Sequence, residues 1–379
     1  MKTFFLLSLL FLVSIISFAQ FTGDGYFRIR NVGSERYIVI TDNKGSVNVG
    51  SMSADLGAVK LYRSFENVVS NPGSVLYVNE VNGLYRFESQ GTDTHEIIGY
   101  DLKLKKNSDG SYKAYQEKGT RLFLCDARKE NTEEGVLSTR SEENNYRDWE
   151  LLPLSANSSN YFGITPEINI GNDYYATLYA SFPFTFYSEG MQAYYISTVD
   201  ENIAVLSEVE DNIVPASMPV IIRCSSPEPE LNKLEVDANI AAEKPSVNKL
   251  LGVYFKNTSK AHYNSTPYDS ETMRVLGTTS DGSLGFIKAD IELLPANKAY
   301  LTVPSDTPDE LVLMSEEEYD NYKTGIIDIK DSMTKNPSAL VDVYTLQGIR
   351  VKSQVRFNTL QSTLPEGIYV VNGRKIIVR

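Results

Sequence analysis

Apolar and polar residues alternate along most of the chain, and clusters of Gly, Asn, Asp and Ser separate the alternating runs. Residues 26–30, 194–196 and 376–378 are examples of this alternation. It is typical of strands that bury one face. The segments Asn107–Gly110 and Thr279–Gly282 each separate two such runs, which predicts hairpin turns. Amphipathic helix patterns are scarce, so the sequence predicts an all-β fold.

One helix is nevertheless predicted near residue 315. The run from Ser315 to Glu318 has the pattern of a capping box, in which the first side chain and the fourth each bond the other's backbone. We expect a short helix through about Lys323. Residues 315–338 as a whole are predicted to form a linker, because they are acidic at first and end in a polar, Pro-containing stretch.

The N-terminus has the three parts of a secretory signal. Lys2 supplies the positive charge, and an apolar run covers residues 4–18. Small residues at positions 17 and 19 then predict cleavage between Ala19 and Gln20. The apolar run is about 15 residues long, short of the ~20 that cross a bilayer. We therefore interpret residues 1–19 as a signal peptide and expect the chain to be exported.

Residues 20–154 are predicted to form the first domain. This segment opens with strand patterns at Gly25–Asn31 and Arg36–Ile40, and it closes with a third at Arg147–Pro153. Related pairs of strand patterns return near residues 75–87 and 112–124, roughly one repeat for every 40 residues. Three such units suit a β-trefoil, a closed barrel with hairpins at one end.

The phrases GYFRIRNV, RYIVI and DWELLP in this domain resemble the ricin-B-type lectin trefoils. Repeats of that family tend to end in a Gln-x-Trp motif. Here one altered copy is present, with Arg147 in the place of Gln and Trp149 as the Trp. The resemblance implies a β-trefoil fold, and it makes carbohydrate a candidate ligand.

Residues 161–314 are predicted to form a β-sandwich domain with an internal pseudo-repeat. The phrase at Ile213–Ile222 returns in related form at Leu293–Leu301, and in both a Pro-Ala pair leads through a polar turn into an apolar strand. The phrase also resembles a module of exported Bacteroidetes proteins. We interpret the aromatic residues at 179, 182, 184 and 186 as part of the sandwich core.

Residues 339–379 are predicted to form a C-terminal β segment. Val341–Val351 contains strand, Gly turn and strand, and Asn372-Gly373 separates two further apolar runs, which is a strong hairpin signal. The phrases VYTLQGIRV and LPEGIYVVNGRKIIVR resemble the C-terminal sorting domain of the type IX secretion system. That resemblance implies secretion machinery as a partner and a secreted or outer-membrane surface location. Without sorting, the signal peptide alone predicts a periplasmic protein.

A short glycosylation motif precedes this segment. Asp331-Ser332-Met333 resembles the Bacteroidetes O-glycosylation motif, which makes Ser332 the candidate acceptor. The two cysteines, Cys125 and Cys224, lie in different predicted domains, each in an apolar run. We expect two buried thiols rather than an interdomain disulfide.

The charge and the scarcity of histidine narrow the possible functions. The formal net charge of −13 repels phosphate backbones, so we expect no nucleic-acid partner. A zinc site needs several converging ligands, and a catalytic triad needs a His held by a carboxylate. The two histidines, His95 and His262, lie in polar stretches of different predicted domains, and we interpret both as solvated loop residues. We therefore expect no catalytic residue, metal or cofactor.

Sugar recognition needs an aromatic ring for the apolar face of the sugar and planar polar groups for its hydroxyls. Two clusters near the first and third repeats supply these residue types. The carbohydrate-binding candidates are Tyr37, Asp42, Asn43, Asp126, Asn131 and Tyr146. The alternative interpretation is that Tyr37 packs the barrel and the polar residues cap turns.

The sequence thus predicts a non-enzymatic, secreted or cell-surface protein that binds carbohydrate or a glycoconjugate. The first alternative is a structural or protein-interaction module that binds no sugar. The second is a glycoside hydrolase, since paired carboxylates can support that chemistry. No motif selects a pair among the 49 acidic residues.

Overall fold

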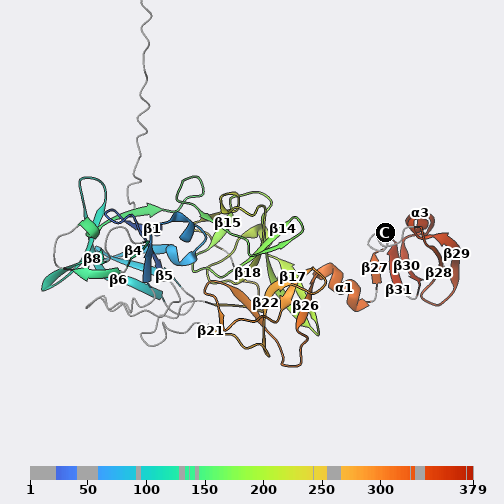
Figure 1. The fold of residues 1–379 in the computed structure, drawn as a ribbon. Coiled ribbons are helices and arrows are strands. Elements are labelled where there is room, and N and C mark those ends of the chain that lie inside the picture. Colours follow the sequence, from blue (N-terminus) through green and yellow to red (C-terminus); the bar gives the residue numbers. More distant parts are fainter. Residues whose placement is uncertain are drawn as a thin grey trace, which may run out of the picture.

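A computed structural model of the chain confirms the all-β prediction, with many strands and only short helices (Figure 1). The structure describes residues 23–40, 59–90, 95–127, 133–135, 137–140, 145–241, 243–253, 266–324, 326–328, 338–372 and 374–378. The short 3-10 helices are η2 (Phe65–Asn67), η3 (Pro72–Ser74), η4 (Asn145–Arg147), η5 (Glu210–Asn212), η6 (Pro229–Leu231) and η7 (Phe357–Thr359).

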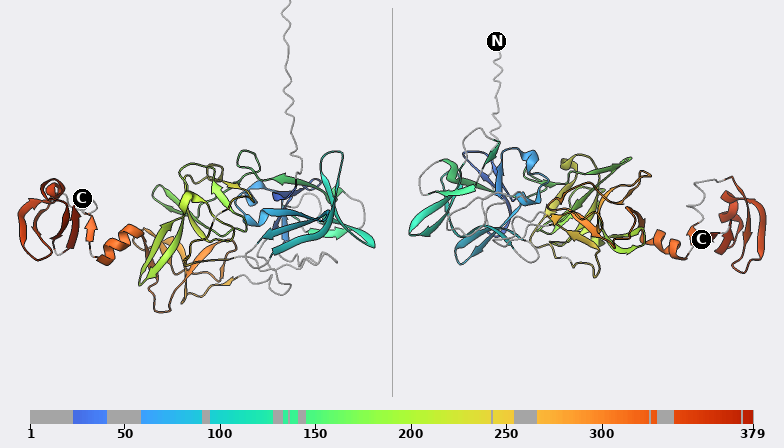
Figure 2. Two further views of the ribbon diagram at one scale, coloured as in Figure 1. Left: turned by 180° about the vertical axis from the view of Figure 1, so that it is seen from behind. Right: turned by 60° about the horizontal axis from the view of Figure 1, so that its bottom comes forward.

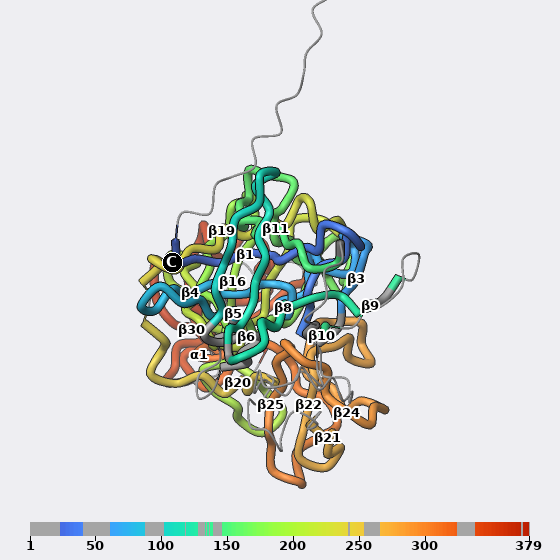
Figure 3. The backbone as a smooth tube through the Cα atoms, turned by 90° about the vertical axis from the view of Figure 1, so that its left-hand side faces the viewer, coloured from blue at the N-terminus to red at the C-terminus, as the bar shows by residue number. Residues whose placement is uncertain are grey.

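Six antiparallel strands of the first unit pair in a closed circuit, each with the next and the last with the first. They are β1 (Gly25–Asn31), β4 (Leu76–Val81), β5 (Leu84–Gln90), β6 (His95–Lys106), β7 (Tyr112–Lys118) and β11 (Asp148–Pro153). Such a barrel has no free edge within the circuit. Figure 3 looks at the molecule from the side of this barrel.

Hairpins extend from the barrel between its strands. The additional strands are β2 (Tyr37–Ile40), β3 (Val59–Tyr62), β8 (Thr120–Asp126), β9 (Glu134–Gly135) and β10 (Leu137–Arg140). β2 pairs with β3, β3 with β9, and β8 with β10. The β5–β6 pair also continues, through two register shifts, to the pairing of Gln90 with His95. Six barrel strands with three such projections form a β-trefoil-like unit.

The barrel encloses a continuous apolar core to which all six strands or their hairpins contribute. Phe27 and Ile29 of β1 point into it, as the alternation of the strand requires. Trp149 is fully buried there, and its indole Nε1 donates a 3.0 Å hydrogen bond to the backbone oxygen of Leu124. The single tryptophan of the chain therefore holds β11 against β8.

The central unit is built on one ten-stranded sheet. Its strands in spatial order are β13 (Ile168–Ile170), β14 (Asp173–Leu178), β18 (Val220–Cys224), β16 (Gln192–Asp200), β17 (Ile203–Glu208), β26 (Glu310–Ser315), β23 (Leu284–Ile287), β22 (Met273–Thr278), β25 (Ala299–Thr302) and β20 (Leu250–Gly252). A smaller sheet contains β12 (Phe162–Gly163), β19 (Lys233–Val236) and β15 (Phe184–Phe186), and β21 (Thr266–Pro267) pairs with β24 (Leu293–Leu294).

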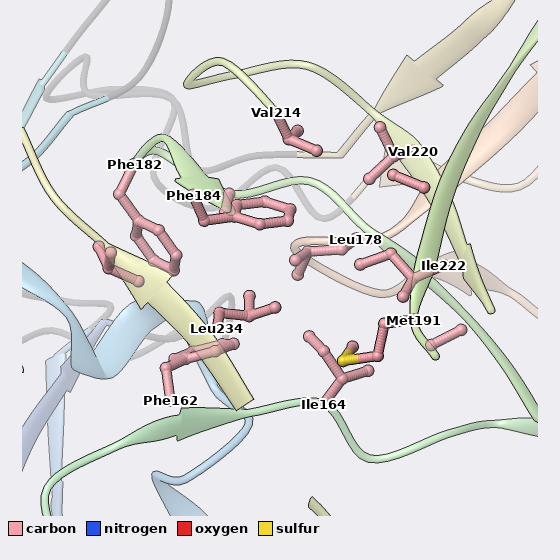
Figure 4. Packing of buried hydrophobic residues seen from close by; sticks show 14 of the residues in the cluster. Phe162, Ile164, Leu178, Phe182, Phe184, Met191, Val214, Val220, Ile222 and Leu234 are labelled. Carbon is pink, nitrogen blue, oxygen red and sulfur yellow. The ribbon is translucent and has the colours of Figure 1, made fainter. Parts of the chain in front are cut away.

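Two apolar clusters lie on opposite faces of the large sheet. On one face the smaller sheet packs its Phe162, Phe184 and Leu234 against Ile222 of β18, so this part is a sandwich (Figure 4). On the other face Ile221 packs with residues of the second half of the sheet. Residues 220–222 of β18 are therefore buried on both faces, which explains three consecutive apolar residues there, since strands covered on both faces need not alternate.

The two Pro-Ala phrases occupy equivalent places in the two halves of the large sheet. The strand at the end of each phrase, β18 or β25, pairs with an earlier strand, β14 or β20. Ser217 and Asn297 hold the same position in the phrase, and both have positive φ, 55° and 62°. The sequence echo thus encodes one turn geometry used twice.

The C-terminal unit is a five-stranded sheet with its own apolar core. Its strands in spatial order are β27 (Ile326–Asp328), β31 (Arg374–Val378), β30 (Gly367–Val371), β28 (Leu340–Tyr344) and β29 (Arg350–Arg356). The short helix α3 (Leu360–Thr363) follows η7. Figures 1 and 2 show this unit at the opposite end of the molecule from the barrel, beyond helix α1 (Glu316–Thr324).

Local turn and cap predictions are confirmed. Ser315 and Glu318 form the expected capping box at α1, with the Ser315 backbone N–H donating to the Glu318 carboxylate at 2.7 Å. The Glu318 N–H donates to the Ser315 hydroxyl at 3.2 Å. Both expected Gly turns join paired strands, with Gly110 and Gly282 at φ of 90° and 86°. No helix within the described ranges is long and apolar enough to span a membrane.

Candidate functional site

The structure describes three of the six carbohydrate-binding candidates. Tyr37 begins β2, Asp126 ends β8 and Tyr146 lies in η4. Asp42, Asn43 and Asn131 lie outside the described residues, as do Ser332, His262 and the cleavage site at Ala19 and Gln20. His95 begins β6, opposite Gln90.

Asp126 is buried rather than displayed. Its side chain is fully shielded from solvent, and it accepts a hydrogen bond from the equally buried guanidinium of Arg36. The backbone at Gly135 closes over this pair, because a Cβ there would lie 2.8 Å from both Asp126 oxygens. The ion pair joins the hairpin of the first repeat to that of the third. In this structure the carboxylate serves the packing of the barrel and does not face solvent.

Tyr146 contributes its backbone to the same end of the barrel. Its carbonyl accepts a 2.8 Å hydrogen bond from the side-chain amide of Asn31. The Asn31 side-chain oxygen in turn accepts from the backbone N–H groups of Gly33 and Ser34 at 3.1 and 3.0 Å. These hydrogen bonds hold the turn before Tyr37 and the segment of Tyr146 together. The Tyr146 side chain is partly exposed.

Tyr37 is the first of three partly exposed aromatic residues that we call the aromatic row: Tyr37, Phe65 and Tyr161. The ring centroids of Tyr37 and Phe65 are 6.2 Å apart, and those of Phe65 and Tyr161 are 5.7 Å apart. The neighbouring planes are inclined by 58° and 72°. The row thus begins on the barrel and ends at the entry to the central unit.

Charged groups surround the Tyr37 end of the row. The guanidinium carbon of Arg30 lies 5.8 Å from the Tyr37 ring centroid. Arg30 also pairs with Glu150 at 3.1 Å and with Glu35 at 3.4 Å. Alternation along β1 places Arg30 on the outer face of the barrel, and its neighbour on β11 is Glu150. One partly exposed ring therefore has a guanidinium and two carboxylates within reach.

Burial raises the pKa of the Tyr37 hydroxyl above its ordinary value, although the positive charge of Arg30 acts in the opposite direction. The pKa of the Tyr161 hydroxyl is raised as well, mainly by burial. Both phenols are consequently neutral near pH 7 and can donate a hydrogen bond.

Arg28 contacts Phe65 and Tyr161 of the aromatic row from the buried side, a role that was not predicted from the sequence. It is fully buried and donates to Asn160 Oδ1 at 2.9 Å and to the Tyr161 carbonyl at 2.7 Å. Its guanidinium carbon lies 5.2 Å from the Phe65 ring centroid. Burial lowers the Arg28 pKa to about 10, so the group remains charged at neutral pH. The signal in the sequence is a charged residue between two apolar ones, Phe27 and Ile29.

A hollow with a volume of about 630 Å³ lies on the central unit and is lined by Tyr268, Lys288 and Asp309 among others. One of its charged groups, Lys288, already has carboxylate partners. Lys288 pairs with Glu271 at 3.0 Å and with Asp309 at 3.7 Å. The aromatic row combines similarly paired charges with three neighbouring rings, so we favour it over this hollow.

Comparison with known proteins assigns no family: no family model matches the chain, and neither does any curated protein sequence. Within the described part of the chain, no three His, Cys, Asp or Glu side chains are grouped to hold a metal ion. Cys125 and Cys224 are both buried and are not joined by a disulfide. The fold and the candidate site therefore define the class of this protein only as an all-β protein of several units with an aromatic, charged surface site.

Proposed function

We propose that this chain is an exported, non-enzymatic protein whose trefoil-like unit binds carbohydrate at the Tyr37 end of the aromatic row. The observation that carries the proposal is the partly exposed Tyr37 ring with Arg30 5.8 Å from its centroid and two carboxylates paired to that arginine. A sugar presents an apolar ring face, which matches the aromatic ring, and vicinal hydroxyls, which match the guanidinium and the carboxylates.

The arrangement allows a division of tasks between the residues. The ring of Tyr37 would contact the C–H face of a sugar. Glu35, whose side chain is 62% exposed, would accept hydrogen bonds from hydroxyls, and Arg30 would donate them. Glu150 is only 18% exposed and would hold Arg30 in place.

The other end of the row has a structural task. Phe65 and Tyr161 connect the barrel to the central unit, where the Gly163 N–H also donates to the Val69 carbonyl at 3.1 Å. This observation favours the second candidate function, a structural module in which the row serves as an interdomain seam. The two functions differ in what Tyr37 contributes, because a seam residue affects stability and a ligand residue affects affinity.

A glycan array probed with residues 20–379 tests the proposal. For any glycan that binds, Tyr37→Ala is expected to reduce the affinity roughly tenfold, because it removes the ring on which the sugar packs. Tyr37→Phe retains the ring, so it should keep most of the affinity. Glu35→Gln should weaken binding without altering the fold, since that side chain is mostly exposed.

Tyr322→Ala is the matched control, because Tyr322 on α1 is 52% exposed and lies far from the barrel along the chain. It should leave glycan affinity unchanged. Fluorescence of the buried Trp149 verifies that each variant keeps its barrel folded. The proposal is wrong if the folded protein binds no glycan, or if Tyr37→Ala binds as tightly as the control.

We further propose that the C-terminal unit acts as a sorting element after signal-peptide removal at Ala19. The supporting observation is a sheet with its own apolar core. β30 and β31 lie in the middle of this sheet, so deletion of residues 363–379 would remove the strands that join β27 to β28. We expect the truncated protein to stay in the periplasm, whereas undiminished arrival at the surface or in the medium would contradict sorting.

A further inference from the structure

The strand β29 is unusually open for a member of a sheet. It pairs with β28 and forms one edge of the five-stranded sheet. Six of its seven residues are exposed, so both faces of the strand and its free edge are accessible to solvent. An open edge presents unpaired backbone N–H and C=O groups, which can pair with an added strand.

The turn that leads into β29 is rigid and apolar. The backbone N–H of Thr345 donates to the Ile349 carbonyl at 2.8 Å, and that of Gly348 donates to the Thr345 carbonyl at 2.9 Å. Gly348 takes the positive φ of 82° that this tight turn requires. Leu346 and Ile349 are nevertheless 52% and 66% exposed. Large apolar side chains held open on a fixed turn are typical of a binding surface.

The charge of this unit is opposite to that of the rest of the chain. Residues 338–379 contain six basic and two acidic residues, a net charge of +4, whereas the whole chain carries −13. The remaining residues therefore carry −17. β29 contributes three of the basic residues, Arg350, Lys352 and Arg356, and all three are exposed.

We propose that β29 is a docking edge for an extended, acidic segment of another protein, which adds to the sheet as a further strand. Positive side chains on the edge repel a second copy of β29, so they disfavour edge-to-edge self-association. The same charges attract a strand that carries acidic residues at alternate positions. Leu346 and Ile349 add apolar contacts at the turn end.

The far end of β29 limits where such a strand can pair. Gln354 has a φ of 50°, and its backbone N–H donates to Asp342 Oδ1 at 2.8 Å. The register with β28 shifts at this point and again between Lys352 and Arg350. The positive φ of Gln354 interrupts the extended backbone, so we expect the added strand to pair along residues 350–353, between Gln354 and the turn. This inference does not depend on the carbohydrate site or on sorting.

The test uses the full chain and two peptides of the same length as β29, one of alternating Thr and Glu and one of alternating Thr and Lys. We expect the acidic peptide to bind and the basic peptide not to bind. Hydrogen exchange of the complex should slow at amides of residues 350–353, because an added strand protects the backbone of the edge. Binding without that protection would overturn the proposal.

Lys352→Glu is expected to weaken the acidic peptide roughly tenfold, since it places like charges across the new strand pair. Arg374→Glu is the matched control, because Arg374 is also exposed and belongs to an inner strand of the same sheet. Equal weakening by both variants would show a diffuse charge effect and would overturn the proposal. The proposal would also be overturned if the acidic peptide does not bind. Vesicles of phosphatidylserine and phosphatidylcholine serve as a second probe, and binding to these vesicles without binding to the acidic peptide would likewise overturn the proposal.

Discussion

Asp126→Asn is expected to destabilise the barrel by about 3–5 kcal/mol, because it removes the carboxylate charge that is paired with the buried guanidinium of Arg36. Both side chains are fully shielded from solvent, so water cannot replace the lost carboxylate. The substitution keeps the volume of the side chain, which matters because the backbone at Gly135 lies against the pair. In a unit of this size the loss corresponds to a decrease in melting temperature of about 10–20 °C.

The single tryptophan makes this measurement specific to the barrel. Trp149 is fully buried in the barrel core, so its fluorescence reports unfolding of this unit and not of the central or C-terminal units. Urea unfolding followed by Trp149 emission gives the free energy of unfolding for the unmodified chain and for each variant.

A double-mutant cycle with Arg36→Met separates the ion pair from other losses. Each single substitution removes one charge of the pair and keeps the other buried, whereas the double variant removes both. We therefore expect the double variant to be more stable than the sum of the single losses predicts, by about 1–3 kcal/mol. Strictly additive losses, or a loss below about 1 kcal/mol for Asp126→Asn, would refute the assignment of this pair as a structural link between repeats.

Three further predictions concern local features. Hydrogen bonds from Lys103, and to a lesser degree from Arg121, lower the pKa of Glu117 to about 2. The stabilisation from these hydrogen bonds is therefore complete above pH 4.5 and is lost as the pH falls through about 2. An NMR titration of Glu117 should show this low midpoint, and a midpoint near 4.5 would contradict the prediction. Ser315→Ala removes the N-cap of α1, and faster amide exchange confined to that helix is expected, with a loss of about 1 kcal/mol. Burial raises the pKa of Cys224 to about 12, so thiol reagents should react with it only after denaturation, and rapid labelling of the folded protein would contradict the structure.

Local sequence patterns predicted the features whose causes are themselves local. The capping box at Ser315 and the turns at Gly110 and Gly282 depend on residues within a few positions, and each is present as expected. The apolar run in β18 predicted a strand, but its burial on two faces depends on sheets formed by distant residues. The pairing of β17 with β26, which is parallel and joins the two halves of the large sheet, left no local signal.

The surroundings of the sugar-binding candidates also depend on distant residues. Tyr37 lies partly exposed beside charged groups. Its charged neighbours, Arg30 and Glu150, come from β1 and β11, and only the pairing of those strands brings them together. Asp126 follows an apolar run at a strand end, a place where a polar residue usually meets solvent. Its partner Arg36 is 90 positions away in the sequence, so its burial could not be anticipated.

Helix α1 shows how a composition typical of a linker can conceal a packed element. Its residues are acidic and polar, yet Tyr319 donates to Asp200 at 2.7 Å and Lys323 pairs with the same carboxylate at 2.6 Å. Glu316 accepts a 2.5 Å hydrogen bond from the Ser207 hydroxyl. Three polar contacts along one face hold the helix on the central sheet, and β27 begins two positions after it ends. The first half of the predicted linker therefore extends the central unit, and the C-terminal sheet starts almost directly from a fixed helix.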